Sequence, residues 1–350
     1  MKICFVLPRF TRRPIGGFKI VYEYANRLIE AGDSVSILFL NDNVFVEYKV
    51  PKFLKGLCSD IMTQIEPKWF PLDKSIKKVS GINNAQKKFK DIDICIATGS
   101  ETVDVCKTLF PHAKKCYLIQ AFETWVMEEE KLFDTFNADF KNIAVSSWLK
   151  KIVDEHSKEE CALIKNPIDL QVYRSITPIE QRDKYSIGLL YHTMEEKGLK
   201  YSIDSLRILK EKYKDLKVYM FGTSDLGEEI PGLVKFVKDA SQEETIEIYN
   251  NISVFMSSTI NEGYGLTAME AMACGAAVAS SANQGIYEYG IEGVNCLLSP
   301  IRDSEAMADN VSRLFDDDEL RYRISSQGIE SLREFDWKVA FEKFRKEISN

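Results

Sequence analysis

The sequence predicts an α/β protein of two domains, each built on a sheet of parallel strands. Short apolar runs alternate with helical patterns along the chain, which is typical of parallel strands joined by helices. The alternation forms two successive series that meet near Asn166 and Pro167, where helix is disfavoured. With 350 residues, 45% of them hydrophobic, the chain has material for two ordinary cores. We therefore expect one domain over residues 1–165 and another over 166–335.

Each expected element follows from apolar patterning. In the first series, the strands are expected at residues 2–7, 34–40, 92–98, 115–120, 142–146 and 162–165. Its helical patterns cover residues 18–31, 101–109 and 148–156. In the second series, strands are expected at 186–191, 217–221, 235–237, 254–256, 277–279 and 296–298. The terminal run 337–348 is amphipathic and predicts a last helix.

Composition and charge narrow the class of protein. The chain has no apolar run near eighteen residues, and Met1 leads directly into a strand pattern, so we expect a cytoplasmic protein. Its eight cysteines form no C-x-x-C pair and fit reduced core residues. The three histidines lie far apart in sequence, and no metal site is expected from their spacing. No nucleic-acid-binding module is recognisable.

One segment has a charge opposite to the rest of the chain. Residues 49–90 contain ten lysines and three acidic residues, whereas the whole chain carries a net charge of −7. Large apolar side chains are interleaved with these lysines, as in segments that lie on an anionic membrane surface. An exposed basic face over the edge of a hydrophobic core would explain the same pattern.

The most informative stretch for function runs from Val254 to Pro300. An apolar strand there breaks into the loop Asn261–Gly265, and a helix of small residues follows from Leu266. Glu262 and Glu270 therefore lie around a helix N-terminus, which is a site for anions. A nucleotide sugar would suit such a site, because backbone amides can bind its diphosphate and carboxylates its hydroxyls.

Two other interpretations fit the same residues. Thr267 and Glu270 match a capping box, with Glu262 as a solvated loop residue. The stretch from Gly263 to Ala268 also reads G-x-G-x-x-A, with Glu288 twenty positions beyond Ala268, which would suggest a dinucleotide site.

Several motifs, in order, resemble retaining glycosyltransferases of family 4. They are KICFVLP followed by Gly16 and Gly17, then NPID, the EKG segment, Glu262 and Glu270 with seven residues between them, EAMACGAAVASS, and GIYEYGIEGVNCLLSP. The resemblance covers nearly the whole chain and implies a GT-B fold, with two Rossmann-like domains whose parallel sheets face a central cleft. It also implies a last helix, 336–350, that packs back on the first domain.

The resemblance implies a role for each matching residue. Donor-binding positions would be Gly16, Gly17, His192, Lys197, Gly263, Tyr264, Gly265, Leu266, Thr267 and Glu270. Lys197 would neutralise the diphosphate and Glu270 would hold the ribose hydroxyls. Glu262 would contact the transferred sugar. Gln120 and Glu123, at the end of a strand, are candidates for the acceptor side, with Glu123 as catalytic base.

The chain departs from the family pattern at two places. His192 stands where most members have an arginine, so stabilisation of the leaving group would depend on pH. The histidine that many members carry near residue 120 is absent, and Q-x-x-E followed by an aromatic residue is closer to bacterial rhamnosyltransferase-like members.

Together these features predict a retaining, metal-independent hexosyltransferase of surface polysaccharide biosynthesis. It would need no cofactor besides a nucleoside-diphosphate sugar as co-substrate, and its acceptor would be a glycan or a lipid-linked glycan. Two alternatives remain open. One is a nucleotide-sugar epimerase, and the other is a catalytically silent GT-B protein that binds a glycan or a partner enzyme.

Overall fold

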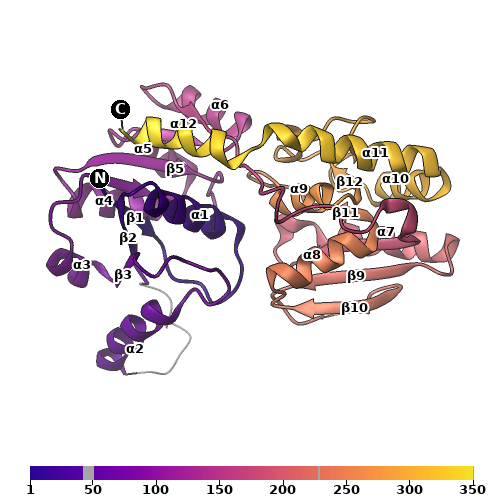
Figure 1. The fold of residues 1–350 in the computed structure, drawn as a ribbon, viewed down its shortest axis with the longest axis horizontal. Coiled ribbons are helices and arrows are strands. Elements are labelled where there is room, and N and C mark those ends of the chain that lie inside the picture. Colours follow the sequence, from indigo (N-terminus) through magenta and orange to yellow (C-terminus); the bar gives the residue numbers. More distant parts are fainter. Residues whose placement is uncertain (42–50, 228, 350) are drawn as a thin grey trace. The chain divides into compact units, whose positions relative to one another are not determined.

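The structure, a computed structural model, describes residues 1–41, 51–227 and 229–349. The chain divides into two compact units, drawn in Figure 1. The first unit contains Met1–Asn166 and Ala340–Asn350, and the second contains Pro167–Val339. Their predicted roles, acceptor side and donor side, stay predictions. Lys49, the first lysine of the basic segment, lies outside the described residues.

The first unit is built on a seven-stranded sheet in the order β3-β2-β1-β4-β5-β6-β7, and all its strand pairs are parallel. Its strands are β1 (Lys2–Leu7), β2 (Ser34–Phe39), β3 (Lys77–Ser80), β4 (Ile94–Ala97), β5 (Lys114–Ile119), β6 (Lys141–Ala144) and β7 (Ala162–Leu163). The side chains from Ile3 to Val6 are wholly buried, as expected for a strand covered on both faces.

The helices of the first unit follow its strands in the expected alternation. They are α1 (Gly16–Glu30), α2 (Lys52–Ile65), α3 (Ile82–Lys88), α4 (Val103–Leu109), α5 (Glu129–Phe136) and α6 (Ser147–His156), with a 3₁₀ turn η1 (Ser100–Thr102) before α4. Three of these helices, α2, α3 and α5, and the edge strand β3 were not among the elements expected from the sequence.

The second unit has a six-stranded parallel sheet in the order β10-β9-β8-β11-β12-β13. Its strands are β8 (Asp183–Tyr191), β9 (Lys217–Gly222), β10 (Leu233–Lys238), β11 (Ile252–Ser257), β12 (Ala277–Ser281) and β13 (Leu297–Ser299). Its helices are α7 (Leu199–Lys212), α8 (Gln242–Asn251), α9 (Leu266–Ala273), α10 (Ser304–Asp316) and α11 (Asp318–Ser331), with 3₁₀ turns η2 (Ile179–Gln181), η3 (Glu195–Lys197), η4 (Ile286–Glu288) and η5 (Leu332–Glu334). The predicted α/β class, with a parallel sheet in each half, is confirmed.

The last helix, α12 (Trp337–Ser349), contributes its final residues to the first unit. Phe344 is wholly buried there, and its ring stacks on Tyr24 of α1 at a centroid distance of 4.0 Å. Arg345 pairs with Asp33 at 3.2 Å, close to the beginning of β2. The C-terminal residues are thus part of the core and edge of the first unit.

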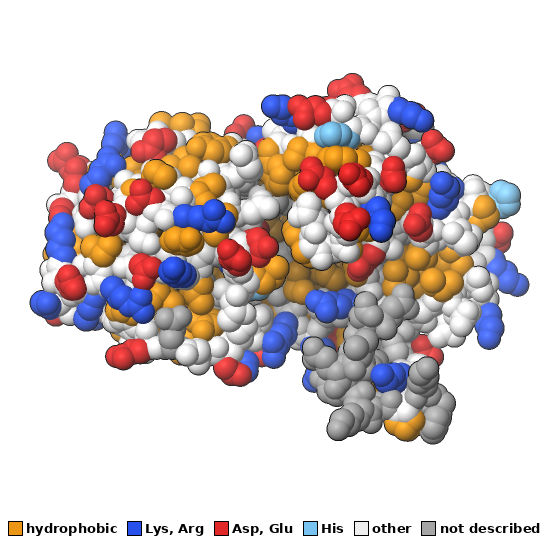
Figure 2. Space-filling model, turned by 180° about the vertical axis from the view of Figure 1, so that it is seen from behind, with side chains coloured by type: hydrophobic (Ala, Val, Ile, Leu, Met, Phe, Trp, Pro, Cys, Tyr) orange, Lys and Arg blue, Asp and Glu red, His pale blue; other side chains and the backbone are white. Residues whose placement is uncertain are grey.

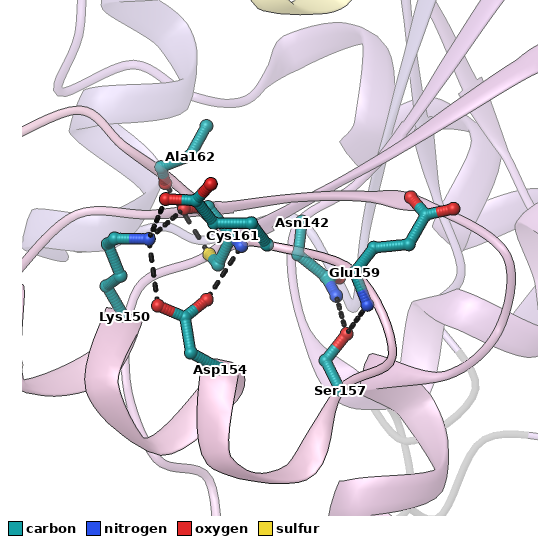
Figure 3. Close-up of polar contacts among 8 residues, drawn as sticks. Asn142, Lys150, Asp154, Ser157, Glu159, Cys161 and Ala162 are labelled. Carbon is teal, nitrogen blue, oxygen red and sulfur yellow. Dashed lines mark hydrogen bonds and ion pairs between the residues drawn. The ribbon is translucent and has the colours of Figure 1, made fainter.

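Polar contacts hold α6 against the segment that leads into β7 (Figure 3). Lys150 pairs with Asp154 at 2.8 Å and donates to the carbonyl of Cys161 at 2.7 Å, while Asp154 accepts from the N–H of Cys161 at 2.8 Å. At the other end of α6, Ser146 occupies the N-cap position, but its side chain makes no cap hydrogen bond.

None of the helices in the described ranges combines the length and apolar character that crossing a bilayer requires. Figure 2 shows acidic and basic side chains interspersed over one face of the molecule.

Candidate functional site

The second unit gathers its candidate residues where two central strands meet. Its strand order corresponds to 3-2-1-4-5-6 in chain order, so β8 and β11 are the first and fourth strands and lie side by side. Ligands of open α/β sheets bind outside the carboxyl ends of such a strand pair, because the connections leave them in opposite directions. Lys197 follows β8 and Glu262 follows β11.

A glycine lets the Lys197 turn approach the end of β11. Gly198 ends η3 with a φ of +64° and begins α7. A Cβ atom at Gly198 would stand 1.9 Å from the carbonyl oxygen of Ser258, so no larger residue fits without a backbone shift. The Glu195–Lys197 turn is therefore held directly against the segment that follows β11.

Hydrogen bonds from a single carbonyl join the two loops of the site. The carbonyl oxygen of Glu196 accepts from the N–H groups of Ile260 at 2.7 Å and Asn261 at 3.2 Å. Since Glu196 precedes Lys197 and Asn261 precedes Glu262, these bonds fix the neighbours of both charged residues relative to each other.

Lys197 and Glu262 form an ion pair. The Lys197 ammonium lies 2.7 Å from Oε2 of Glu262, and the side chains are 24% and 23% exposed. The two residues lie 65 positions apart in sequence. In this pair the carboxylate occupies one side of the ammonium, and the partial exposure leaves both groups accessible to a ligand.

The loop after β11 leads into α9 through a left-handed glycine. Gly265 is the N-cap of α9 with a φ of +85°, and its carbonyl accepts from the Tyr289 hydroxyl at 2.5 Å. Tyr264 is buried, and its ring lies 5.8 Å from that of Tyr289. The backbone amides of Leu266 and Thr267 are the first of the helix, so this end of α9 can donate to an anion.

The capping-box interpretation of Thr267 and Glu270 is wrong. Thr267 lies inside α9, whose N-cap is Gly265 and has no side-chain cap. Glu270 instead lies in the second turn, where its Oε2 accepts from the Tyr249 hydroxyl of α8 at 3.3 Å. Burial, followed by the Glu270 charge, raises the pKa of Tyr249 well above its usual value, so Tyr249 stays a donor at neutral pH.

The structure also argues against the dinucleotide interpretation. The glycine fingerprint of a dinucleotide site belongs in the first strand-to-helix turn of its sheet. Gly263 and Gly265 follow β11, the fourth strand, and the turn after the first strand contains Lys197 instead. Glu288, the expected ribose ligand of that interpretation, is buried.

Three further residues shape this site, and the sequence did not single them out as site residues. A Cβ at Gly285 would lie 2.8 Å from the carbonyl carbon of Tyr264, so Gly285 allows the two loops to touch. Tyr289 fixes the N-cap of α9, as described. Buried Arg182 donates to the carbonyls of Tyr249 at 3.0 Å and Cys274 at 2.6 Å, at the ends of α8 and α9. Only the glycine and aromatic content of GIYEYG offered a signal.

His192 lies between the end of β8 and η3. Its Nδ1 accepts from the N–H of Met194 at 3.1 Å. Burial lowers the pKa of His192 below its ordinary value; the Lys197 charge lowers it further, and Glu262 and Glu196 oppose the shift. The imidazole is therefore neutral at pH 7. Because the folded state disfavours the imidazolium, the free energy of unfolding should fall as pH drops below the ordinary histidine pKa.

If the β8–β11 site binds a sugar nucleotide, as the sequence predicts, this neutral state predicts an affinity that depends on pH. A diphosphate beside His192 would favour the imidazolium, so a sugar nucleotide should bind about tenfold tighter at about pH 5.5 than at about pH 8. The intact sugar nucleotide is the probe of choice, because its bridging phosphates do not titrate in this range. Calorimetric titration of His192→Arg should give tight binding at both pH values, and His192→Gln weak binding at both. A wild-type affinity that does not change with pH would remove His192 from the diphosphate site.

The first unit presents its candidate residues at the carboxyl ends of β1, β4 and β5. Gly16 and Gly17 form the first turn of α1, whose N-cap is Ile15, whereas the sequence placed them before the helix. A Cβ at Gly17 would lie 3.4 Å from the side-chain amide of Gln120, which follows β5. Gly17 and Gln120 are thus neighbours.

Glu123 is tied to the turn after β4. Its Oε2 accepts from the N–H of Ser100 at 2.6 Å, and a Cβ at Gly99 would lie 3.5 Å from its Oε1. Burial raises the pKa of the Glu123 carboxyl, and the hydrogen bond from Ser100 limits the rise. A carboxylate with a raised pKa accepts a proton more readily than an exposed one, as a general base requires.

Each unit therefore brings its own candidates together. Lys197, Glu262 and the N-terminus of α9 share one end of the second sheet, with Glu270 one turn into that helix. Gly17, Gln120 and Glu123 share one end of the first.

Comparisons with known proteins agree with this arrangement. The chain is 24% identical over 210 residues to an uncharacterized glycosyltransferase of Methanocaldococcus jannaschii, which covers 59% of the chain and 58% of that protein. It is 26% identical over 159 residues to the capsular polysaccharide biosynthesis glycosyltransferase CapM of Staphylococcus aureus, with 42% and 40% covered. The chain thus spans about half the length of these relatives.

A solved structure matches the whole chain. Anabaena HepE in complex with UDP-glucose superposes with a TM-score of 0.74 at 14% identity, and the match covers 100% of this chain and 99% of that one. Two Rossmann-like units, each with a parallel sheet, make up a GT-B-type fold. Residues 178–331 match the family described as glycosyl transferases group 1. This match lies within the second unit. The likeness of the chain to rhamnosyltransferases stays a prediction.

Proposed function

We propose that this protein is a retaining hexosyltransferase that moves a sugar from a nucleoside-diphosphate sugar to a glycan or lipid-linked glycan. The observation that carries the proposal is the Lys197–Glu262 pair at the β8–β11 junction, beside the N-terminus of α9. A cation and a helix N-terminus suit a diphosphate, and the adjacent carboxylate suits sugar hydroxyls. Anabaena HepE, whose fold is similar, is described with UDP-glucose bound.

The proposed mechanism stabilises the leaving group. Lys197 and the amides of Gly265 and Leu266 would receive the charge that develops on the diphosphate, while Glu262 would hold the transferred sugar. Preorganised donors of this kind give the largest single contribution to many transfers. If the acceptor attacks from the face that the diphosphate leaves, the anomeric configuration is retained. No metal is required by this scheme.

Glu270 would bind the ribose of the donor. The Tyr249 hydroxyl occupies one position on its carboxylate at 3.3 Å and holds the side chain toward α8. A carboxylate fixed in this way can accept from both ribose hydroxyls without reorganising.

The nucleotide class and the role of Glu270 can be tested together. A thermal-shift screen against UDP, GDP, dTDP and NAD should give a shift with one nucleoside diphosphate and none with NAD. Glu270→Ala should weaken that binding by about tenfold or more, because charged hydrogen bonds are lost. Glu211→Ala, an exposed glutamate of α7, is the matched control and should bind as wild type. A response to NAD alone would contradict the proposal.

A second function has one observation in its favour. The neutral state of His192, where most members of the resembled family carry arginine, would weaken stabilisation of the leaving group. A catalytically silent protein that binds a glycan or a partner enzyme could tolerate this. Donor hydrolysis that is lost in Lys197→Ala would exclude it, whereas nucleotide binding without any hydrolysis or transfer would favour it.

For location, we propose the cytoplasm, with peripheral attachment to the inner face of the membrane. The eight cysteines are all free thiols, and seven of them are buried, as is typical of proteins in reducing compartments. Surface polysaccharide biosynthesis is the proposed setting, since CapM is described with capsular polysaccharide biosynthesis.

A further inference from the structure

Helix α2 (Lys52–Ile65) turns polar side chains toward the rest of the first unit. Ser59 and Thr63 are 7% and 0% exposed. Both bind the side-chain amide of buried Asn41 at 3.1 Å, and Ser59 also lies 2.6 Å from the Ser80 hydroxyl at the end of β3. The inner face of α2 is therefore held by a hydrogen-bonded network of polar side chains.

The opposite face of α2 is apolar and exposed. Leu54, Leu57, Ile61 and Ile65 are 37%, 57%, 51% and 44% exposed. Their spacing of three, four and four residues places them in one stripe along the helix, and Ser59 and Thr63 lie on the other side. This polarity is the reverse of that of an ordinary surface helix, whose apolar stripe faces the core. These four residues form the α2 stripe.

The surroundings of the α2 stripe are basic. Residues 51–90 contain nine lysines and three acidic residues. The lysines at 68, 74, 77, 87, 88 and 90 are exposed. Figure 1 shows α2 beside β3 and near α3, the two elements that carry several of these lysines.

The segment has three acidic residues against nine lysines, and only one of the three, Asp73, is exposed. Asp60 accepts from the Asn84 amide of α3 at 2.8 Å. Glu66 is buried and lies 3.8 Å from Arg12. Asp73 accepts from the N–H of Ser75 at 2.8 Å. The exposed groups around the helix are thus mainly ammonium groups.

We propose that the α2 stripe docks on a bilayer with anionic headgroups. Its aliphatic side chains would enter the boundary between headgroups and acyl chains, with the helix parallel to the membrane plane, and the surrounding lysines would contact the headgroups. This inference rests on the peripheral attachment proposed above and assigns it to one helix. It concerns a different surface from the β8–β11 junction, so it can fail while the transferase proposal holds.

Charge favours a bilayer over a second copy of the chain. Two copies that met through α2 would bring two strongly basic segments together, which is unfavourable. Nucleic acid would supply the negative charge, but the stripe is aliphatic and offers no aromatic side chain for stacking on bases. An anionic bilayer provides both an apolar interior and negative charge.

Vesicle sedimentation tests the proposal directly. Full-length protein is mixed with vesicles of phosphatidylcholine alone, and with vesicles in which one lipid in four is phosphatidylglycerol. We expect sedimentation with the anionic vesicles, weakened by high salt, and little with the zwitterionic ones. Leu57→Ser/Ile61→Ser should lower binding by about tenfold or more, because two inserted side chains are lost.

Matched variants distinguish the effect of losing inserted side chains from the effects of losing charge and of misfolding. Ile208→Ser/Val234→Ser changes two exposed aliphatic residues of the second unit and should bind as wild type. Lys87→Glu/Lys88→Glu should weaken binding to anionic vesicles, whereas Lys338→Glu/Lys343→Glu should not. Thermal unfolding and the nucleotide response of each variant should match wild type, which shows that the fold and the β8–β11 site are intact.

Three outcomes would overturn the proposal. One is wild-type binding by Leu57→Ser/Ile61→Ser, and another is equal sedimentation of wild type with both kinds of vesicle or with neither. The third is a wild-type dimer in analytical ultracentrifugation that the stripe variant makes monomeric, which would assign the α2 stripe to a second copy of the chain.

Discussion

Replacement of Lys197 by alanine is expected to lower donor turnover by about 100- to 1000-fold, the usual effect of removing one preorganised donor from a leaving group. The loss should fall on kcat more than on KM, because the diphosphate charge that Lys197 meets is largest in the transition state. The ion pair with Glu262 is partly exposed, so its removal should change the free energy of unfolding little.

The measurement is steady-state hydrolysis of the sugar nucleotide, followed by release of the nucleoside diphosphate. Lys200→Ala, an exposed lysine three residues further along in α7, is the control and should turn over as wild type. Lys197→Arg keeps the charge and should recover part of the activity. If Lys197→Ala retained wild-type kcat, the assignment of Lys197 to the leaving group would have to be abandoned.

Replacement of Glu123 by glutamine is expected to reduce transfer to the acceptor by about 100-fold or more, since a positioned base contributes at least this much. Glutamine has a carbonyl oxygen that can still accept from the Ser100 N–H, which Glu123 binds at 2.6 Å, so the local geometry should persist. Donor hydrolysis without acceptor should stay close to the wild-type rate. This difference separates a base for the acceptor from a residue that binds the donor.

Glu123→Gln should also change how the free energy of unfolding depends on pH. The raised pKa of Glu123 means that the folded state favours the protonated carboxyl. Its contribution to stability is present below the unfolded pKa and is lost as pH rises through the folded pKa. Glu123→Gln should therefore be at least as stable as wild type at about pH 8, with a smaller pH dependence. Chemical unfolding at two pH values measures this, with exposed Glu130→Gln as control. Unchanged acceptor transfer would exclude Glu123 as the base.

The sequence predicted the helices and strands whose own residues have a clear pattern of apolar side chains. The β-branched and apolar run of β11 and the small-residue helix α9 both lie where they were expected. The edge strand β3 was missed because two of its four residues are lysines. Helix α2 was missed because its polar and apolar faces are reversed, so its apolar residues did not indicate a core helix.

Some residues of the candidate site could be predicted from the sequence and others could not. Glu262 and Glu270 could be found from the loop-to-helix transition, but their partners could not. The pairing of Glu262 with Lys197 depends on β8 and β11 being neighbours, which only the topology of the sheet decides. Arg182 has no sequence signal, because its partners are backbone carbonyls at the ends of α8 and α9.

The carbonyl of Glu196, which accepts from both Ile260 and Asn261, couples the two loops of the second unit mechanically. A substitution that tilts one peptide in the first loop would also move the second, so changes in the two loops should be non-additive. Anyone who seeks to alter donor preference by transplanting loops from a relative should therefore exchange residues 192–198 and 258–265 together, since either loop alone would meet a partner shaped for a different backbone.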